Sequence, residues 1–443
     1  MSYKPSDIDY LGGGGGKIPK HWEIKPLQVI FNQRNEQNNN LEFQTILSLV
    51  KDVGVIPYEE KGNVGNKAKD DLQGYKIARV NDLVLNKMNA VIGSLGVSKY
   101  NGLVSPIYLV LYIANPNYLI TYYSYLFQIK SVQKFLRKFA YGIMEIRESI
   151  DYLEFKKMFL PLPPLQEQKE IAEFLDKKCE KIQNYIDKKQ KLITLLQEKK
   201  QALINEVVTK GLNPNIEFKN SEIEYLGLIP HHWEVVKVKY IATTNIGLVY
   251  DPSEIATNEN VGYPVLRANN IQNGKIDYKD VIYVAKKIDD KQLAISGDLL
   301  MCVRNGSENL LGKTAKIENN NFSFGAFTAI IRSDLNNYLY WIFQTEMLKK
   351  SISSFIVSIG IGQISQDDIK NFKIPLPPLQ EQKEIAEFLD KKCEKINSAI
   401  EKTKKQIELV KEYKNTLINE AVCGRVACSR DFSPTAQNDK KKN

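Results

Sequence analysis

The sequence contains few of the residues on which metal sites, disulfide frameworks and many active sites depend. Its 443 residues include five Cys, three His and three Trp. So few cysteines, and an odd number of them, do not form a disulfide framework in a chain of this length, which favours a reducing compartment. No apolar run approaches the roughly 18 residues of a membrane span, and the opening Met1–Pro5 lacks the apolar stretch of a secretory signal. We therefore expect a cytoplasmic protein without a membrane partner.

Catalytic motifs are equally scarce. His21 and His232 both lie in an Ile-Pro-x-His-Trp-Glu segment without the serine or cysteine elbow of a hydrolase, which favours a structural role for both. The cysteines lack zinc-ligand spacing, and no Walker motif is present. Asn115–Tyr118 resembles the Asn-Pro-Pro-Tyr loop of adenine methyltransferases, but the second proline and a glycine-rich cofactor turn are missing. We expect no active site, no bound metal and no cofactor in this chain.

The charge balance is a weak guide to function. The formal net charge is +9, and 43% of the residues are hydrophobic, enough to build cores and to exclude wholesale disorder. Basic residues are in excess in residues 1–160, whereas residues 221–374 are slightly acidic. Because a nucleic-acid-binding protein neutralises phosphates with Lys and Arg, charge alone favours such a partner only for the first block.

An internal duplication is the strongest feature of the sequence. Residues 161–182 and 375–396 share the same 22 letters, PLPPLQEQKEIAEFLDKKCEKI, at an offset of 214. Leu203–Glu206 recurs as Leu417–Glu420 at the same offset. A repeat of this size is the first guide to the fold. The chain therefore consists of a variable block and a conserved segment, followed by a second copy of both.

The repeat predicts an α+β fold. Apolar runs at 107–113 and 327–331, rich in β-branched and aromatic residues, indicate strands, and the stretches 118–139 and 336–354 that follow them indicate helices. Each variable block is thus a mixed α/β domain. The predicted segments are residues 1–160 and 213–374 for the variable domains, 161–212 and 375–425 for the conserved helices, and 426–443 for a disordered tail.

Two apolar rows with seven-residue spacing run along each conserved segment, which is the coiled-coil pattern. Both copies interrupt the pattern at matching positions, Lys189 with Thr403 and Lys200 with Lys414. Separate amphipathic helices, each lying on its own domain, would explain one such seam but not two with the same interruptions. We therefore predict a long antiparallel coiled coil with a pseudo-two-fold internal repeat, each helix ending at a glycine cap.

Candidate binding residues lie in the variable blocks. Polar clusters follow a predicted strand at Leu85–Asn89 and Cys302–Gly306, and a third cluster, Arg267–Asn270, aligns with Leu47–Val50. Arg suits the O6/N7 edge of guanine and Asn the N6/N7 edge of adenine, although Asn and Gly are also ordinary turn residues. The candidate DNA-binding residues are Asn86, Lys87, Asn89, Arg267, Asn269, Asn270, Arg304 and Asn305.

This layout resembles the specificity (S) subunit of type I restriction-modification systems. The resemblance is carried by Pro161–Gln168 and Pro375–Gln382, which open the conserved helices, and by Ile18–Glu23 and Ile229–Glu234, which open the variable domains. It covers nearly the whole chain. The run Gly12–Gly16 departs from it, because the second copy has only one glycine there.

The resemblance implies two target recognition domains, each reading one half of an asymmetric bipartite site in double-stranded DNA. The helices would set the spacer and dock two modification (M) subunits. This chain would be non-catalytic, since S-adenosylmethionine, ATP and Mg would bind to the M subunits and to restriction (R) subunits. The alternative is a scaffold that binds only proteins through its variable domains. A stand-alone methyltransferase or nuclease is disfavoured by the missing motifs.

Overall fold

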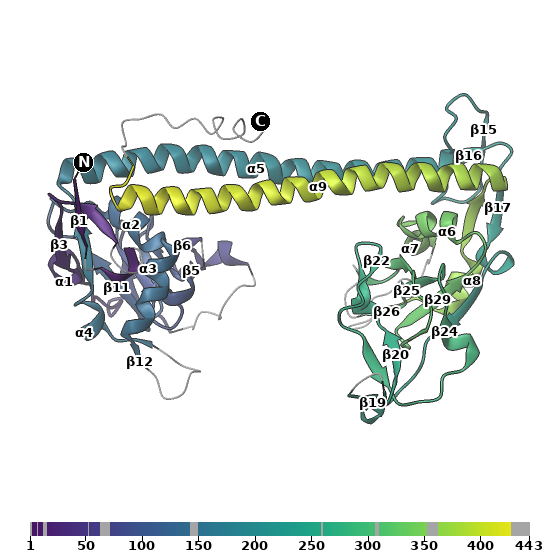
Figure 1. Ribbon diagram of the computed structural model, residues 1–443, viewed down its shortest axis with the longest axis horizontal. Coiled ribbons are helices and arrows are strands. Elements are labelled where there is room, and N and C mark those ends of the chain that lie inside the picture. Colours follow the sequence, from purple (N-terminus) through teal and green to yellow (C-terminus); the bar gives the residue numbers. More distant parts are fainter. Residues whose placement is uncertain are drawn as a thin grey trace, which may run out of the picture. The chain divides into compact units, whose positions relative to one another are not determined.

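The computed structural model divides the chain into two compact units, each with one variable domain (Figure 1). The first unit comprises residues 1–189 and 405–443, and the second comprises residues 190–404. The structure describes residues 2–6, 8–11, 16–51, 53–62, 71–141, 149–257, 260–305, 310–351 and 362–426. Four glycines of the run 12–16, Gly306, Cys428 and nearly all of the predicted tail lie outside these ranges.

The variable domain of the first unit consists of short strands and short helices. Its strands are β1 (Tyr3–Pro5), β2 (Lys17–Pro19), β3 (Glu23–Pro26), β4 (Asn32–Gln33), β5 (Leu47–Val50), β6 (Gly54–Pro57), β7 (Lys76–Ala78), β8 (Leu83–Asn86), β9 (Leu95–Val97), β10 (Gly102–Val104), β11 (Tyr108–Tyr112), β12 (Ala140–Tyr141), β13 (Ser149–Ile150) and β14 (Phe159–Leu162). Its helices are α1 (Leu27–Ile30), α2 (Ile120–Gln128), α3 (Lys130–Phe135) and α4 (Tyr152–Phe155), with 3-10 turns η1 (Asp9–Leu11), η2 (Tyr58–Lys61), η3 (Ala90–Ile92) and η4 (Leu136–Phe139).

The second variable domain has the same kind of architecture, with more strands among its described residues. Its strands are β15 (Phe218–Asn220), β16 (Leu228–Pro230), β17 (Glu234–Lys237), β18 (Thr243–Ile246), β19 (Ile255–Ala256), β20 (Tyr263–Leu266), β21 (Ile271–Gln272), β22 (Lys275–Ile276), β23 (Ile282–Val284), β24 (Leu293–Ala294), β25 (Leu299–Cys302), β26 (Arg304–Asn305), β27 (Thr314–Lys316), β28 (Phe322–Phe324), β29 (Thr328–Arg332), β30 (Gly362–Gln363) and β31 (Lys373–Leu376). Its helices are α6 (Asn336–Phe343), α7 (Met347–Ser351) and α8 (Gln366–Asn371), with 3-10 turns η5 (Val238–Tyr240), η6 (Pro252–Glu254), η7 (Ala268–Asn270) and η8 (Asp290–Gln292). The predicted α+β class is confirmed.

One antiparallel strand pair forms the centre of each domain, β8 with β11 and β25 with β29. Along β8, Leu83 and Leu85 face one hydrophobic cluster and Val84 faces another, so the strand is apolar on both sides. Strands covered on both faces read as continuous apolar runs, which is why the sequence marked them clearly. The observed strands β11 and β29 lie within one residue of the predicted runs 107–113 and 327–331.

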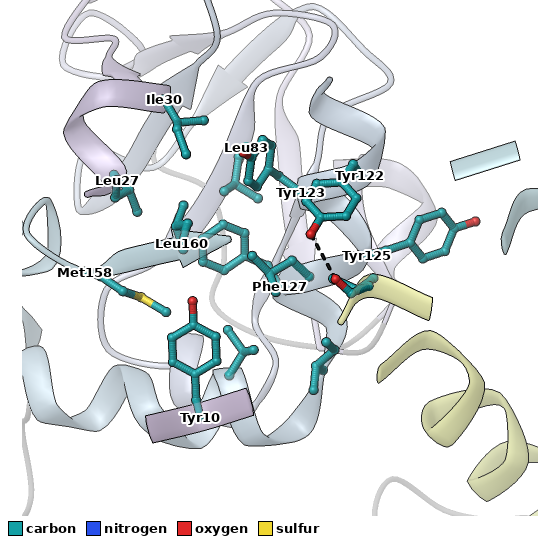
Figure 2. Close-up of a cluster of buried hydrophobic side chains, with 14 of the residues drawn as sticks. Tyr10, Leu27, Ile30, Leu83, Tyr122, Tyr123, Tyr125, Phe127, Met158 and Leu160 are labelled. Atoms are coloured by element: carbon teal, nitrogen blue, oxygen red, sulfur yellow. Dashed lines mark hydrogen bonds between the residues drawn. The ribbon is translucent and has the colours of Figure 1, made fainter. Parts of the chain in front are cut away.

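The predicted helix 118–139 is divided into α2, α3 and η4. The break falls at Ile129, which has extended backbone angles, and the side-chain amide of Gln133 donates to the carbonyl oxygen of Phe127 at 3.1 Å. The predicted helix 336–354 is likewise divided into α6 and α7. The aromatic side chains of α2 face the core: Tyr122, Tyr123 and Phe127 are completely enclosed in the first unit (Figure 2).

The conserved segments form two long helices, α5 (Leu165–Lys210) of 46 residues and α9 (Leu379–Val422) of 44 residues. All seam positions of the heptad pattern are buried or half-buried. Each helix is followed within two residues by a glycine with a left-handed backbone, Gly211 with φ +76° and Gly424 with φ +68°. The predicted glycine caps are confirmed. Among the described helices, none is both long and apolar enough to cross a membrane.

Each unit joins its variable domain to both long helices. In the first unit the core includes Leu175 of α5 and Leu417 of α9, and in the second it includes Val207 of α5 and Leu389 of α9. The buried hydroxyl of Tyr122 donates to the carbonyl oxygen of Val422 at 2.9 Å. Each variable domain therefore shares a hydrophobic core with the helices and is not merely connected to them by a linker.

Candidate nucleic-acid interface

The two variable domains share a framework around one buried aspartate. Asp82 precedes β8 and Asp298 precedes β25, and each accepts a backbone N–H from the residue three positions earlier. Asp82 receives two hydrogen bonds from Arg34, and Asp298 receives two from Arg332. These bonds raise the pKa of both guanidinium groups. The start of the strand is thus fixed in the same way in both domains.

The strand register gives the equivalent positions at the other end. Leu83 pairs with Leu111 in the first domain, and Leu299 pairs with Ile331 in the second. Counting along the strands, Asn86 corresponds to Cys302, Asn89 to Asn305 and Ile107 to Phe327. The pairing of Asn89 with Asn305 agrees with the sequence alignment. The same framework therefore carries different side chains where each strand ends.

The first domain places its candidates on a tight turn after β8. The side-chain oxygen of Asn86 accepts the backbone N–H of Met88 at 3.0 Å. Asn89 occupies the N-cap of η3, but its side chain makes no capping hydrogen bond. Lys87 is half-buried and, after burial itself, is the second cause of the lowered pKa of Lys76. Asn89 is exposed and Asn86 is half-exposed, so both amides are accessible to a polar ligand.

Asn86 and Asn89 line a cavity of about 310 Å³ in the first domain. The other walls come from β5, from η2 and from the turn before β11, including Ser48, Tyr58 and Ile107. Sequence reasoning missed these wall residues, because they are far apart in the chain and no local motif joins them.

In the second domain, the cluster after β20 is organised around Asp280. The guanidinium of Arg267 lies 3.4 Å from its carboxylate, and the amide of Asn269 donates to it at 3.0 Å. Asn270 is 1% exposed and donates to the backbone carbonyls of Asp277 and Asp280. Its amide holds the loop that presents Arg267 and Asn269.

The alignment of Arg267 with Leu47 is out by one residue. The bridge from Ile46 to Leu103 corresponds to the pair Val265 and Ser323, so Arg267 stands where the first domain has Ser48. No letters are shared in this region, so the sequence offered nothing to fix the register. Strand pairing fixes it instead.

Arg304, like Asn269, is an exposed candidate of the second domain. It lies on β26, with its guanidinium carbon 5.4 Å from the ring centre of Phe327, which is itself 56% exposed. The backbone N–H groups of Val303 and Arg304 both approach the carbonyl oxygen of Phe327. Asn305 follows on the same strand and is half-buried. DNA contact by any of the eight candidates stays a prediction.

The two His-Trp pairs have a structural environment. His21 and Trp22 both contact the carboxylate of Glu167, at 2.6 and 2.9 Å, and Trp22 is buried. His232 and Trp233 contact Glu381 at 2.6 and 3.0 Å. Each pair ties the start of a variable domain to the first turn of a long helix. Among the described residues, no group of three His, Cys, Asp or Glu side chains could hold a metal ion.

Comparison with known proteins identifies the family. The family described as "Type I restriction modification DNA specificity domain" matches residues 19–196 and 230–409, once in each copy of the repeat. The chain belongs to this family. The predicted resemblance is confirmed, and with it the non-catalytic role, because relatives of the chain are named specificity subunits of type I restriction enzymes.

Among its relatives is the putative type I restriction enzyme MjaX specificity subunit of Methanocaldococcus jannaschii. It is 26% identical over 439 residues, covering 93% of this chain and 95% of the relative. The EcoKI specificity subunit of Escherichia coli K12 is 29% identical over 225 residues, covering 49% of this chain and 48% of the relative. Identity to both relatives is therefore low, and the first is matched over nearly its whole length.

Solved structures share the fold. One, from a study of complex assembly and conformational transition of the type I R-M system, has a TM-score of 0.70 at 16% identity and covers 92% of this chain and 99% of that one. The HsdS subunit of Thermoanaerobacter tengcongensis has a TM-score of 0.50 at 16% identity, with coverage of 92% and 98%. The architecture of this specificity subunit is thus that of known members.

Proposed function

We propose that this specificity subunit reads a bipartite site in double-stranded DNA, one half with each variable domain. The observation that carries the proposal is the shared framework, with Asn86, Lys87 and Met88 at one strand end where the other domain has Cys302, Val303 and Arg304. Asn86 and Asn89 stand at one strand end, and Arg304 and Asn305 stand near the equivalent end. Amides suit adenine and guanidinium groups suit guanine. One framework with two sets of side chains is what an asymmetric target requires.

The long helices are proposed to form the predicted antiparallel coiled coil, with the pseudo-two-fold repeat, and to set the spacer between half-sites. Support comes from the burial of seam residues in each unit: Ile193 of α5 in the second unit and Ile407 of α9 in the first are 3% and 5% exposed. Inserting one heptad in each helix adds about 10 Å. We expect the preferred spacer to lengthen, and an unchanged spacer would contradict this role.

Two M subunits are proposed to dock on the helices. Leu195 of α5 and Leu409 of α9 are 214 residues apart, and both are exposed, at 51% and 64%. Repeated exposed leucines fit two copies of one partner. Leu195→Glu and Leu409→Glu should each remove one M subunit in native mass spectrometry. Lys199→Glu, one helical turn after Leu195 on α5, is the control for the change of charge. Loss of both M subunits from either single variant would argue against separate docking sites.

We further propose that S-adenosylmethionine, ATP and Mg bind to the M and R subunits, and that the protein is cytoplasmic. The competing function is a scaffold that binds proteins only. Selection from a random duplex library with the chain and its cognate M subunit separates the two. We expect enrichment of two short blocks at fixed spacing. Binding that is indifferent to sequence would overturn the DNA-reading proposal.

A further inference from the structure

The candidate residues Asn86 and Asn89 line a hollow of the first variable domain, whereas a surface that reads bases in a DNA groove is expected to protrude. Duplex DNA offers its bases inside grooves, so a protein reads them with side chains that stand out from its surface. A cavity of about 310 Å³ lies at the lower end of the range for small-ligand sites. Such a hollow suits a single group that leaves the duplex.

The cavity has unused hydrogen-bonding groups. Within the described part of the chain, the hydroxyls of Ser48, Ser94 and Ser105 make no hydrogen bond to another protein group, and neither does the amide of Asn89. Asn86 uses its side-chain oxygen for Met88, which leaves the two N–H donors of that amide available. Polar groups converging without protein partners indicate a ligand with several polar edges.

Apolar and charged groups complete the surroundings. Ile92 and Ile107, which also line the cavity, are 54% and 51% exposed. Tyr58 and Tyr108 are wall residues, and burial raises the pKa of the Tyr108 hydroxyl. Lys51 adds a positive charge to the wall. A single nucleotide has flat apolar faces, polar edges and an adjacent anionic phosphate. These features match the apolar walls, the available polar groups and Lys51 of the cavity.

We propose that this cavity binds a single base turned out of the first DNA half-site. The inference rests on the proposed function. Enzymes that hold an extruded base contact its polar edge by hydrogen bonds and its faces by aromatic or apolar side chains. Here Asn86, Asn89 and the three hydroxyls supply the edge contacts, and Tyr58 and Ile107 supply apolar surface. The base is distinct from the adenine that an M subunit methylates.

The second domain differs at the same place. Arg267 stands where the first domain has Ser48, and Gly325 where it has Ser105. The Cγ of Arg267 lies 3.9 Å from the position of a Cβ on Gly325, so the arginine occupies the space between these two positions. Its Nε is buried and has no hydrogen-bond partner. An extruded base is therefore a property of the first half-site alone.

The test uses the complex of this chain with its M subunit on cognate duplexes. At each position of both half-sites in turn, one base is replaced by an abasic analogue, which leaves the opposite base unpaired. Because unpairing costs a few kcal/mol, prior unpairing of the extruded base should strengthen binding at least about tenfold. We expect this gain at one position of the first half-site besides the methylated adenine.

The variant Ser48→Leu fills the cavity without adding charge, and Ser48→Arg introduces the residue of the second domain. Both should abolish the gain at that position and leave unchanged any gain at the methylated adenine. Thermal unfolding of each variant verifies that it folds, and Ile107→Ala provides a milder change expected to reduce the gain. No such position, or a gain that Ser48→Leu does not alter, overturns the proposal. Binding without any sequence preference would instead mean that the proposed function has failed.

Discussion

Tyr125 in the first unit and Trp341 in the second are different residues with the same task. The hydroxyl of Tyr125 donates to Asp176 at 2.6 Å, and the indole N–H of Trp341 donates to Asp390 at 3.0 Å. The two aspartates occupy the same position in the identical helical segments. What the domain must supply is therefore a hydrogen bond from a large, mostly buried aromatic ring, and two side chains meet that requirement.

The glutamines at the start of the helices show the opposite case, in which the same residue makes different contacts in the two units. Gln168 accepts the backbone N–H of Leu119 and donates to Pro163 and Asn117. Gln382 donates to Pro377, but its buried side-chain oxygen has no partner. Identical sequence thus makes unequal contacts, because the loops that reach the helix belong to the variable blocks. The units therefore agree in the aromatic hydrogen bond to the helical aspartate and differ in the loop contacts of the glutamine.

The largest effect is expected from making the two domains alike. Replacing residues 24–160 with residues 235–374 should give a chain that reads the second half-site twice and loses the first half-site entirely. The exchange points lie in equivalent strands, β3 with β17 and β14 with β31. Methylation mapping with the cognate M subunit measures the outcome. Retention of any first half-site preference would mean that the helices contribute to base reading.

Removal of the framework aspartates should destabilise each unit separately. Asp82→Ala or Asp298→Ala leaves a guanidinium without its buried partner, which costs about 3–5 kcal/mol of unfolding free energy. We expect the smaller loss for Asp82→Ala, because Glu36 remains 3.6 Å from Arg34. Hydrogen exchange resolved by segment measures both, with Glu36→Ala as an exposed control below about 1 kcal/mol. Equal loss of protection in both units from one variant would show that they unfold together.

The glycine caps should differ in cost. A Cβ on Gly424 would lie 2.8 Å from Trp22, whereas a Cβ on Gly211 would lie 3.1 Å from Trp233. Both positions also carry the left-handed strain of about 1–2 kcal/mol. We expect Gly424→Ala to destabilise by about 2–4 kcal/mol and Gly211→Ala by about 1–2 kcal/mol. Gly227→Ala isolates the strain, since its φ is +65° and no atom lies within 4 Å. Equal melting temperatures for the two cap variants would contradict this order.

The smallest effect is expected in the alkylation of Cys179 and Cys393, which lie at the same position of the two identical segments. Cys393 is 2% exposed, and burial raises its pKa to about 11. Burial also raises the pKa of Cys179, but this thiol is only half-buried and stays accessible to solvent. A thiol with a raised pKa stays protonated, so the stability it contributes is present below about pH 8.5 and is lost as the pH rises toward 11.

At pH 8 we expect alkylation of Cys393 to be at least about tenfold slower than that of Cys179. Because the surrounding peptides are identical, Cys179→Ser and Cys393→Ser are compared by intact mass, both in a Cys428→Ser background. Equal rates in the two variants would mean that the two helix segments have the same environment.

Prediction from the sequence was accurate for patterns that are local. Strands β11 and β29 were located to within one residue because their apolar runs are short and bounded. The break at Ile129 was missed, since it depends on a capping contact from Gln133. The candidates Asn86 and Asn89 were found from their place after a strand, but the cavity that they line depends on β5 and η2. Those segments approach only through strand pairing.

The sequence by itself determined the duplication, the two long helices with their seams and glycine caps, and the family. Each of these is written as a repeat or a period, and a period specifies a helix face or a strand face without knowledge of distant residues. The tertiary structure alone decided that Arg267 occupies the place of Ser48, that Asn270 is buried, and that Cys179 and Cys393 differ in exposure. The reason is that packing depends on residues far away in the chain, and those residues lie in the blocks where the two copies no longer agree.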